Sequence, residues 1–268
     1  MTDLAIGILG GAGRMGRALV RAVTEAKGAR VIGAVDALGN PDIGKDLGVL
    51  SGLDALGVVL TDDVSALFGR ADVIIDFTVP AATVENARIA AATGTAYVVG
   101  TTGLSPEQQT TVAEAGKRAV VVQAANFSLG VNLTVALTRR LAEVLDDSFD
   151  IEILEMHHRH KVDAPSGTAL ALGRAAAAGR GVDLDAVEDR GRDGITGARK
   201  RGGIGFAVLR GGNVAGDHTV IFAADDERIE LSHKAGDRII FARGAVHAAL
   251  WTAGKTHGHY TMQDVLKL

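Results

Sequence analysis

The sequence predicts an α/β protein: a doubly wound parallel sheet, and a smaller α+β domain with a mostly antiparallel sheet. Two observations support this prediction. Over the first half of the chain, short apolar runs typical of buried strands alternate with segments of helical spacing. Further along, strand-like runs follow one another with turn residues between them. Alternation of strand and helix is typical of parallel sheets, whereas consecutive strands are typical of antiparallel ones.

The same change of pattern divides the 268 residues into two domains. We expect residues 1–128 together with 240–268 to form the first domain and residues 129–239 to form the second. A helix-like segment over 240–254, near the end of the chain, returns to the first domain in this interpretation.

Composition excludes several classes of protein. Hydrophobic residues make up 47% and charged residues 22%, which is an ordinary balance for a soluble globular protein. The net charge of −4 provides no basic field for nucleic acid, and no apolar run reaches the ~20 residues of a membrane helix. The sequence has no cysteine, and the N-terminus does not resemble a signal peptide. We therefore expect a cytoplasmic protein that binds neither nucleic acid nor membrane.

The first domain opens with a β-α-β pattern around a glycine-rich turn. A strand-like run, 4–9, ends at Gly10-Gly11-Ala12-Gly13-Arg14-Met15-Gly16, a helical pattern follows, and a second strand, 31–35, ends at Asp36. Glycines allow a tight turn and close approach of a pyrophosphate, and the following helix offers its N-terminus to that anion. An acid at the end of the second strand accepts hydrogen bonds from a ribose. The pattern is typical of a Rossmann-type dinucleotide site, the alternative being a β-α-β unit without a ligand.

The residue after Asp36 is Ala37, which carries no charge. An NADP site needs a cation for the 2′-phosphate, whereas an NAD site uses the acid. The sequence therefore favours NADH, and leaves NADPH possible through a Lys or Arg from elsewhere in the chain.

Polar turns follow three more strand-like runs, over 71–78, 96–100 and 119–124. The polar residues in these turns are Thr78, Thr101, Thr102 and Asn126. Because ligands of parallel sheets bind beyond the carboxyl ends of strands, we expect these turns to line the cofactor cleft. Ordinary turn chemistry explains each of them taken singly. Ser105 and Pro106 are suited to the start of the helix that follows.

The second domain is predicted from a long helix, a strand with a His-rich end, and more strands. Expected elements are helices over 130–147 and 169–178, a loop over 179–202, and strands over 151–157, 204–210, 218–223 and 228–234.

The His-rich run at 155–168 carries most of the candidate chemistry. It contains His157-His158-Arg159-His160-Lys161 and ends at a predicted helix start, Ser166-Gly167-Thr168. Backbone N–H groups and hydroxyls at a helix start suit a carboxylate or phosphate, and the cations beside them favour this over simple capping. A histidine titrating near neutrality is a suitable general acid beside a hydride acceptor.

Two histidine pairs in this chain also suit a metal ion. His158 and His160 share one face of an extended strand, as do His257 and His259. No further ligand at metal spacing completes either pair, so we expect no metal site. A solvated, His-rich surface is the remaining alternative for the run.

These motifs together resemble the 4-hydroxy-tetrahydrodipicolinate reductase (dihydrodipicolinate reductase) family. The resemblance covers nearly the whole chain and is most specific in the run from Glu155 to Thr168. Other parts that carry it are 10–16, Asp76-Phe77-Thr78, Gly100-Thr101-Thr102-Gly103, Ala124-Ala125-Asn126-Phe127-Ser128, Arg210-Gly211-Gly212, Gly216-Asp217-His218-Thr219-Val220 and 260–266. Two other hypotheses are a different two-domain dehydrogenase and a non-catalytic nucleotide sensor. Other two-domain dehydrogenases lack the His-rich run, and a nucleotide sensor would not need a proton donor.

The resemblance implies hydride transfer from NADH or NADPH to 4-hydroxy-tetrahydrodipicolinate, giving tetrahydrodipicolinate and water in lysine and diaminopimelate biosynthesis. It implies a homotetramer formed through the sheets of the second domain. It implies that His157 and Lys161 are catalytic and that His158, Gly167 and Thr168 hold the substrate carboxylates, with Ser166 at the same helix start. The cofactor residues it implies are Gly10, Gly11, Ala12, Gly13, Arg14, Met15, Asp36, Gly100, Thr101, Thr102, Ala124, Ala125, Asn126 and Phe127.

Overall fold

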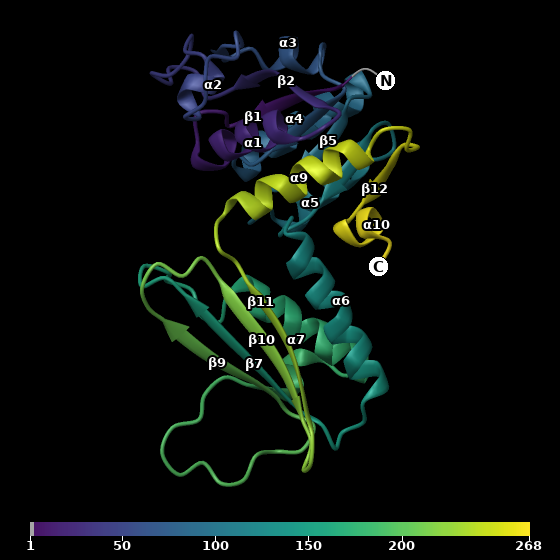
Figure 1. Cartoon of the computed structure of the whole chain (residues 1–268). Helices are drawn as coiled ribbons and strands as arrows, with labels where there is room; N and C mark the ends of the chain where they lie inside the picture. The colour runs from purple at the N-terminus through teal and green to yellow at the C-terminus, as the bar shows by residue number, and fades with distance from the viewer. Residues whose placement is uncertain (1–2) are drawn as a thin grey trace. The chain divides into compact units, whose positions relative to one another are not determined.

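The computed structural model describes residues 3–268 and divides them into two compact units (Figure 1). Unit 1 contains the residues up to Leu129 together with Ile239–Lys267, and unit 2 contains Gly130–Arg238. The chain therefore leaves unit 1 once and returns to it once.

A seven-stranded sheet, parallel in every pairing, forms the centre of unit 1, with strand order β12-β6-β5-β4-β1-β2-β3. Its strands are β1 (Leu4–Leu9), β2 (Ala29–Val35), β3 (Leu60–Thr61), β4 (Val73–Asp76), β5 (Ala96–Val99), β6 (Val120–Gln123) and β12 (Gly258–Tyr260). The chain order reverses between β1 and β4, which makes that edge the expected ligand site of a doubly wound sheet. This arrangement confirms the predicted Rossmann-type architecture.

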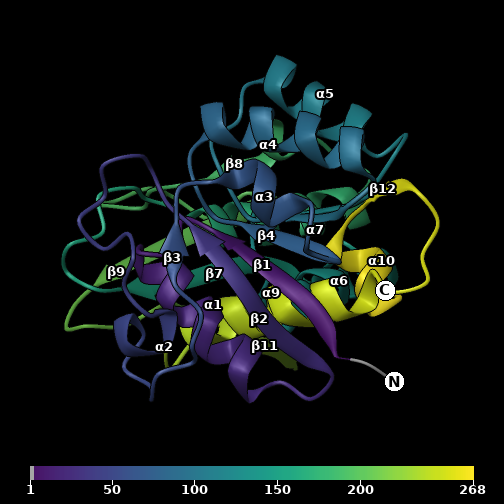
Figure 2. The same cartoon turned by 90° about the horizontal axis from the view of Figure 1, so that it is seen from above.

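Helices cover both faces of this sheet. They are α1 (Arg14–Glu25), α2 (Leu47–Leu50), α3 (Val64–Phe68), α4 (Pro80–Thr93), α5 (Pro106–Ala115), α9 (Ile239–Trp251) and α10 (Met262–Leu266). Figure 2 shows α1 and α9 on one side of the strands and α4 and α5 on the other. The predicted start of α5 is present: Ser105 forms a capping box with Gln108, and Pro106 is the first helical residue.

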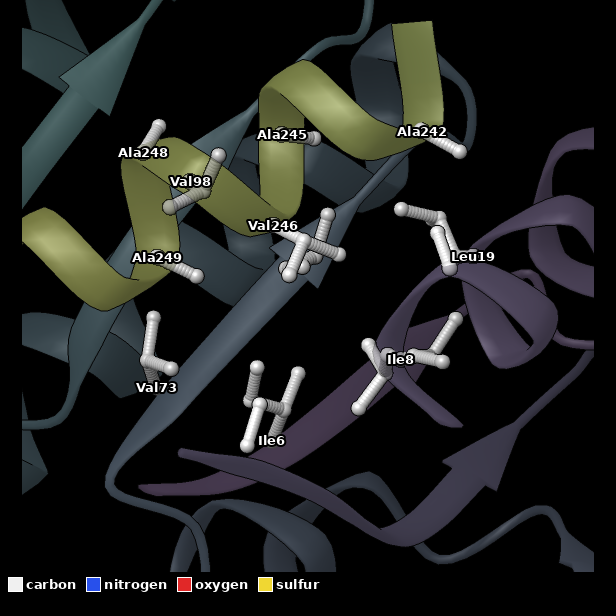
Figure 3. Close-up of a cluster of buried hydrophobic side chains, with 14 of the residues drawn as sticks. Ile6, Ile8, Leu19, Val73, Val98, Ala242, Ala245, Val246, Ala248 and Ala249 are labelled. Atoms are coloured by element: carbon white, nitrogen blue, oxygen red, sulfur yellow. The ribbon is translucent and has the colours of Figure 1, made fainter. Parts of the chain in front are cut away.

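Side-chain alternation along the strands gives unit 1 two apolar cores. Ile6 and Ile8 of β1 pack with Leu19 of α1 and with the alanine-rich face of α9 (Figure 3). Leu9 belongs to the core on the opposite face, with residues of α4 and α5. A strand buried on both faces must be apolar at every position, which explains its continuous apolar run.

Unit 2 is built on a five-stranded sheet of order β11-β10-β7-β9-β8. Its elements are α6 (Leu129–Val144), β7 (Asp150–His157), α7 (Gly167–Arg180), α8 (Leu184–Val187), β8 (Glu188–Asp189), β9 (Ile204–Arg210), β10 (Asp217–Ala223) and β11 (Arg228–Lys234). Strand β10 is antiparallel to both neighbours, whereas β7 pairs with β9, and β9 with β8, in parallel. The sheet is thus mixed, because the chain crosses over between β7 and β9 through α7.

Several short elements were not predicted from periodicity. The segment 179–202, expected to be a loop, contains the end of α7, then α8 and β8. Strand β12 was missed as well, and it adds an edge strand next to β6. Across residues 3–268, no helix combines the length and apolar character needed to cross a membrane.

Candidate active site

The glycine-rich turn after β1 requires glycine at specific positions. Gly10 has a φ of +72°, which favours glycine, and its carbonyl accepts a hydrogen bond from Gly13 N–H at 3.1 Å. A β-carbon at Gly16 would lie 2.2 Å from the Gly10 oxygen and 2.7 Å from Gly11 Cα. Helix α1 can therefore begin directly against the turn only because residue 16 has no side chain.

The N-terminus of α1 fits a pyrophosphate. Its N-cap residue is Gly13, and no side chain caps it. The first N–H groups of a helix lack intrahelical acceptors and carry the positive end of the helix dipole. An anion would satisfy them, so the turn and helix start are suited to a dinucleotide cofactor.

Asp36, at the end of β2, lies against this turn. Its Oδ2 accepts a hydrogen bond from Ala12 N–H at 2.9 Å, and its Oδ1 accepts one from the Asn40 side chain at 3.1 Å. The side chains of Arg17 and Lys45 both pair with Asp42, at 3.0 and 2.7 Å. Two cations of this region are thus already engaged by a carboxylate.

The other predicted cofactor residues lie at the same sheet edge. Gly100 N–H donates to the Asp76 carbonyl at 2.8 Å, and Ala124 N–H donates to the Val99 carbonyl at 3.1 Å, so the turns after β4, β5 and β6 are in register. A hollow of about 190 Å³ opens there, lined by Met15, Phe77, Ala125, Asn126, Phe127 and Phe241. Gly100 is needed beneath it, since a β-carbon would meet the Phe77 ring at 2.3 Å.

A buried carboxylate supports this edge. Asp76 is fully buried and accepts hydrogen bonds from the hydroxyls of Thr78, Thr101 and Tyr97 and from the Asn86 side chain. Burial, followed by the charge of Asp76, raises the pKa of Tyr97, so the phenol remains protonated and donates. The Thr101 hydroxyl thus points into the protein, and only its backbone and the exposed Thr102 remain for a ligand.

In unit 2, His157 lies at the end of β7 and is oriented by Glu155. The imidazole Nδ1 lies 2.7 Å from Glu155 Oε2. Glu155 is only 1% exposed, and Arg210 pairs with both of its carboxylate oxygens, at 2.8 and 3.0 Å. Burial raises the pKa of the Glu155 carboxyl, but hydrogen bonds from Arg210, His157 and Ser166 outweigh it and hold the pKa below its usual value.

The chain after His157 leads from β7 to α7 through a loop held by backbone hydrogen bonds. His158 N–H donates to the Val214 carbonyl at 2.8 Å, and Lys161 N–H donates to the His158 carbonyl at 3.1 Å. The Lys161 ammonium pairs with Asp163 at 2.8 Å. The Ala164–Pro165 peptide bond is cis and directly precedes α7.

Ser166 is the N-cap of α7 and is buried. Its hydroxyl accepts from Ala169 N–H at 3.1 Å and lies 2.9 Å from His218 Nε2, while its N–H donates to Glu155 Oε1 at 3.0 Å. Ser166 therefore fixes the helix start, and Gly167, the first residue of α7, is exposed. Burial lowers the pKa of His218 to about 4, so this partner is neutral at neutral pH.

His158 lies among cations. Burial lowers its pKa, and the nearby charges of Arg238, His157, His160 and Lys161 lower it further. Its ring is 6.3 Å from that of His160. Within residues 3–268, no group of three or more potential ligands among His, Cys, Asp and Glu is arranged to hold a metal ion.

Comparison with known families decides the assignment of this site. The model described as "Dihydrodipicolinate reductase, N-terminus" matches residues 4–127, and the one described as "Dihydrodipicolinate reductase, C-terminus" matches residues 130–266. The chain belongs to the dihydrodipicolinate reductase family. It is therefore an oxidoreductase with a nicotinamide cofactor.

Curated members of this reductase family resemble the chain along its whole length. A 4-hydroxy-tetrahydrodipicolinate reductase of Bradyrhizobium diazoefficiens is 59% identical over 268 residues, covering 100% of this chain and 99% of its own. One of Rhodopseudomonas palustris is 58% identical, covering 100% and 98%.

Solved structures share the fold. A dipicolinate-bound dihydrodipicolinate reductase from Paenisporosarcina sp. TG-14 superposes with a TM-score of 0.77 at 21% identity, covering 97% of this chain and 98% of its own. An amine dehydrogenase from Mycobacterium smegmatis superposes with a TM-score of 0.60 at 14% identity, covering 96% and 94%.

The candidate site contains residues that were not predicted from the sequence. Glu155, Arg210 and His218 meet around His157 and Ser166, and Asp76 lies under the turns of unit 1. Each of the four stands within a motif that carried the family resemblance. Their presence in those motifs was the available signal, but their mutual contacts were not visible in the sequence.

Proposed function

We propose that this chain transfers a hydride from NAD(P)H to 4-hydroxy-tetrahydrodipicolinate, giving tetrahydrodipicolinate and water, in lysine and diaminopimelate biosynthesis. One observation carries the proposal: the Glu155 carboxylate is hydrogen-bonded both to the His157 imidazole and to the N–H of Ser166 at the start of α7. Relatives named 4-hydroxy-tetrahydrodipicolinate reductase, 59% identical and matched end to end, support it.

We assign the two halves of this reaction to the two domains predicted from the sequence. Residues 1–128 with 240–268 bind the dinucleotide, because they contain the glycine-rich turn and the sheet edge beside it. Residues 129–239 bind the substrate, because they contain the His-rich run.

The reaction consumes one hydride and one proton. A bound nicotinamide cofactor supplies the hydride. His157 and Lys161 are the proposed proton-transfer residues. His157 Nδ1 is engaged by Glu155, so Nε2 is the nitrogen available to exchange a proton with the substrate. The Lys161 ammonium has three donor hydrogens and pairs with Asp163, whose side chain is 59% exposed.

The carboxylates of the substrate are assigned to His158 and to Gly167 and Thr168 at the start of α7. A helix start attracts a carboxylate through its N–H groups and dipole. Ser166, predicted to bind the substrate with them, has its hydroxyl directed to Ala169 N–H and His218, so we give it the role of holding Gly167 and Thr168 in place.

The cofactor is assigned to the residues that the sequence indicated around the turns after β1, β2, β5 and β6, and we propose that NADH is preferred. Asp36 is available to a ribose, and Ala37 after it offers no charge to a 2′-phosphate. Arg17 and Lys45, which also stand near this turn, are paired with Asp42.

We propose a homotetramer that forms through the sheet of unit 2. Alternation along the strands turns Ile153 and Val220 into the core with α7, and turns Leu154 and Ile221 to the opposite face. Met156, Ala207 and Leu209 share that second face by register, and none of these residues belongs to the unit 2 core. By the same register Glu152, Thr219 and Glu230 lie on this face as well, so it is a mixed surface whose apolar side chains a partner sheet would cover.

We also propose a cytoplasmic location, which the lack of cysteine in the sequence supports.

A coupled assay tests the proposal. The purified protein is supplied with the product of a freshly operating dihydrodipicolinate synthase reaction, and NADH and NADPH are followed in parallel by absorbance. We expect oxidation of cofactor only when the synthase is active, and faster oxidation of NADH. Tight NADH binding without turnover would favour a nucleotide sensor, and turnover only on other substrates would favour a different dehydrogenase.

A further inference from the structure

We propose that Glu155, held by Arg210, is the positioning residue of this active site. Its carboxylate sets the proton position on His157 and ties that imidazole to the carboxylate-binding start of α7. This inference rests on the proposed function, because it assigns to Glu155 the task of orienting the proton-transfer residue of that reaction.

The Glu155 carboxylate receives four hydrogen bonds from three elements. Oε2 accepts from Arg210 at 2.8 Å and lies 2.7 Å from His157 Nδ1. Oε1 accepts from Arg210 at 3.0 Å and from Ser166 N–H at 3.0 Å. An Arg–carboxylate pair with two parallel bonds is geometrically specific, so the carboxylate plane is fixed by Arg210 before any substrate binds.

An ionised carboxylate can only accept hydrogen bonds, so His157 Nδ1 must carry the hydrogen. The neutral imidazole then has its lone pair on Nε2, and the cationic form has its exchangeable proton there. Orientation of a catalytic imidazole by a buried carboxylate works in this way in Ser-His-Asp triads. In this chain the carboxylate comes from the same strand, two residues earlier.

The surroundings of His157 leave Nε2 as its working nitrogen. The ring of His218 packs edge-on against the imidazole, with ring centroids 5.1 Å apart. A β-carbon at Gly216 would lie 3.0 Å from Nε2, so glycine at that position avoids crowding the nitrogen. The charged or titratable groups around the ring are Glu155 on β7, Arg210 on β9, His218 on β10, and His158 and Lys161 in the following loop.

The Glu155–Arg210 pair also holds the proposed substrate-binding residues in place. Arg210 also donates to the Asp163 carbonyl at 2.7 Å, and Asp163 pairs with Lys161. The remaining donor to Glu155 is the N–H of Ser166, the residue immediately before Gly167. The ion pair between buried Glu155 and partly exposed Arg210 thus connects His157, the Lys161 loop and the helix start, although the two residues stand 55 positions apart in the sequence.

The test uses Glu155→Gln, with Glu227→Gln on the exposed turn between β10 and β11 as the matched control. For Glu155→Gln we expect kcat to fall roughly 10–100-fold, the range seen when the partner that orients a metal-binding histidine is lost. The dissociation constant for NADH should not change. Glu155→Asp should restore part of kcat.

Solid-state ¹⁵N NMR of histidine-labelled protein provides a readout independent of activity, with His157→Gln identifying the His157 signals. At alkaline pH the wild-type imidazole should carry its hydrogen on Nδ1, and Glu155→Gln should lose that preference. An Nε2–H tautomer in the wild type would overturn the proposal even if Glu155→Gln fails to fold. A wild-type kcat in a folded Glu155→Gln would also overturn it. An Nδ1–H tautomer in a protein without reductase activity would instead contradict the proposed function alone.

Discussion

At the residue scale, the candidate chemistry depends on how side chains divide their hydrogen bonds. His157 uses Nδ1 for Glu155 and keeps Nε2, whereas the Ser166 hydroxyl bonds to its own helix and to His218. Thr101 directs its hydroxyl to Asp76 in the same manner. Residues that are neighbours in a motif therefore have different proposed tasks: one is assigned to a ligand, and the next holds the first in place.

Removal of the proposed proton-transfer groups should reduce turnover without reducing cofactor affinity. We expect His157→Gln and Lys161→Ala each to lower kcat about 10²–10⁴-fold, the usual contribution of a general acid or base. The dissociation constant for NADH should stay the same, since the glycine-rich turn belongs to unit 1. Steady-state kinetics with His257→Gln and Lys117→Ala, both at exposed positions, provide the controls. Unchanged kcat in both test variants would mean that the roles are misassigned.

Cofactor preference should depend on the charge at residue 37. Ala37→Arg places a guanidinium beside the proposed ribose site and should raise the ratio of kcat/KM for NADPH to that for NADH at least about tenfold, equivalent to ~1.4 kcal/mol. Ala37→Gln, which adds length without charge, is the control and should leave the ratio nearly unchanged. The proposal of an NADH-type site would be contradicted by a wild-type enzyme that already prefers NADPH.

At the element scale, the start of each of two helices is defined by a different device. Helix α1 begins at a glycine with no side-chain cap, which leaves its N-terminus to a ligand. Helix α7 begins at Ser166, which caps it, and which is itself held by Glu155 and His218. Both devices are local in sequence, and both were predicted from residue type and position.

Close packing of α1 against the turn gives a prediction about Gly16. In Gly16→Ala the new methyl group would lie 2.2 Å from the Gly10 oxygen, so helix and turn must separate. Overpacking of this kind costs about 1–3 kcal/mol of unfolding free energy, and NADH should bind more weakly because the helix N-terminus moves. Denaturant titration and NADH-binding titration measure the two effects.

Gly69→Ala is the matched control in unit 1, since its β-carbon would meet nothing closer than 3.6 Å. Its unfolding free energy should stay within about 0.5 kcal/mol of the wild type. Equal effects of the two substitutions would show that general loss of glycine, not the close approach at residue 16, is responsible.

At the scale of the whole molecule, the chain forms two units with separate cores. Unit 1 has an apolar core on each face of its sheet, whereas the sheet of unit 2 buries one face against its helices and carries both apolar and polar side chains on the other. The second face is the proposed surface for assembly.

A charge on that face should prevent assembly. Ile221→Glu should lower the mass measured by sedimentation velocity from about four times the 27.6 kDa chain to a smaller species, because an unpaired carboxylate is costly to bury. Val144→Glu, at a 64% exposed position on α6, is the control and should leave the mass unchanged. A wild-type protein that sediments as a monomer would contradict the proposed homotetramer.

The sequence by itself determined what local patterns can encode. Glycine spacing after an apolar strand, an acid at the end of the next strand, and a Ser–Pro or Pro–Ser helix start each depend on a few consecutive residues, and the structure shows Gly10 to Gly16, Asp36, Ser105 and Ser166 in those local positions. The strand and helix alternation determined the fold class for the same reason, since burial on one or two faces leaves a period in the sequence.

Only the tertiary structure decided how separate segments meet. The addition of β12 beside β6, the parallel pairing of β7 with β9, and the meeting of Glu155, Arg210 and His218 join residues far apart in the chain. Such contacts leave no period or spacing, because they depend on which strands become neighbours. For the same reason the sequence indicated His157 as a candidate acid but not the buried carboxylate that fixes its proton.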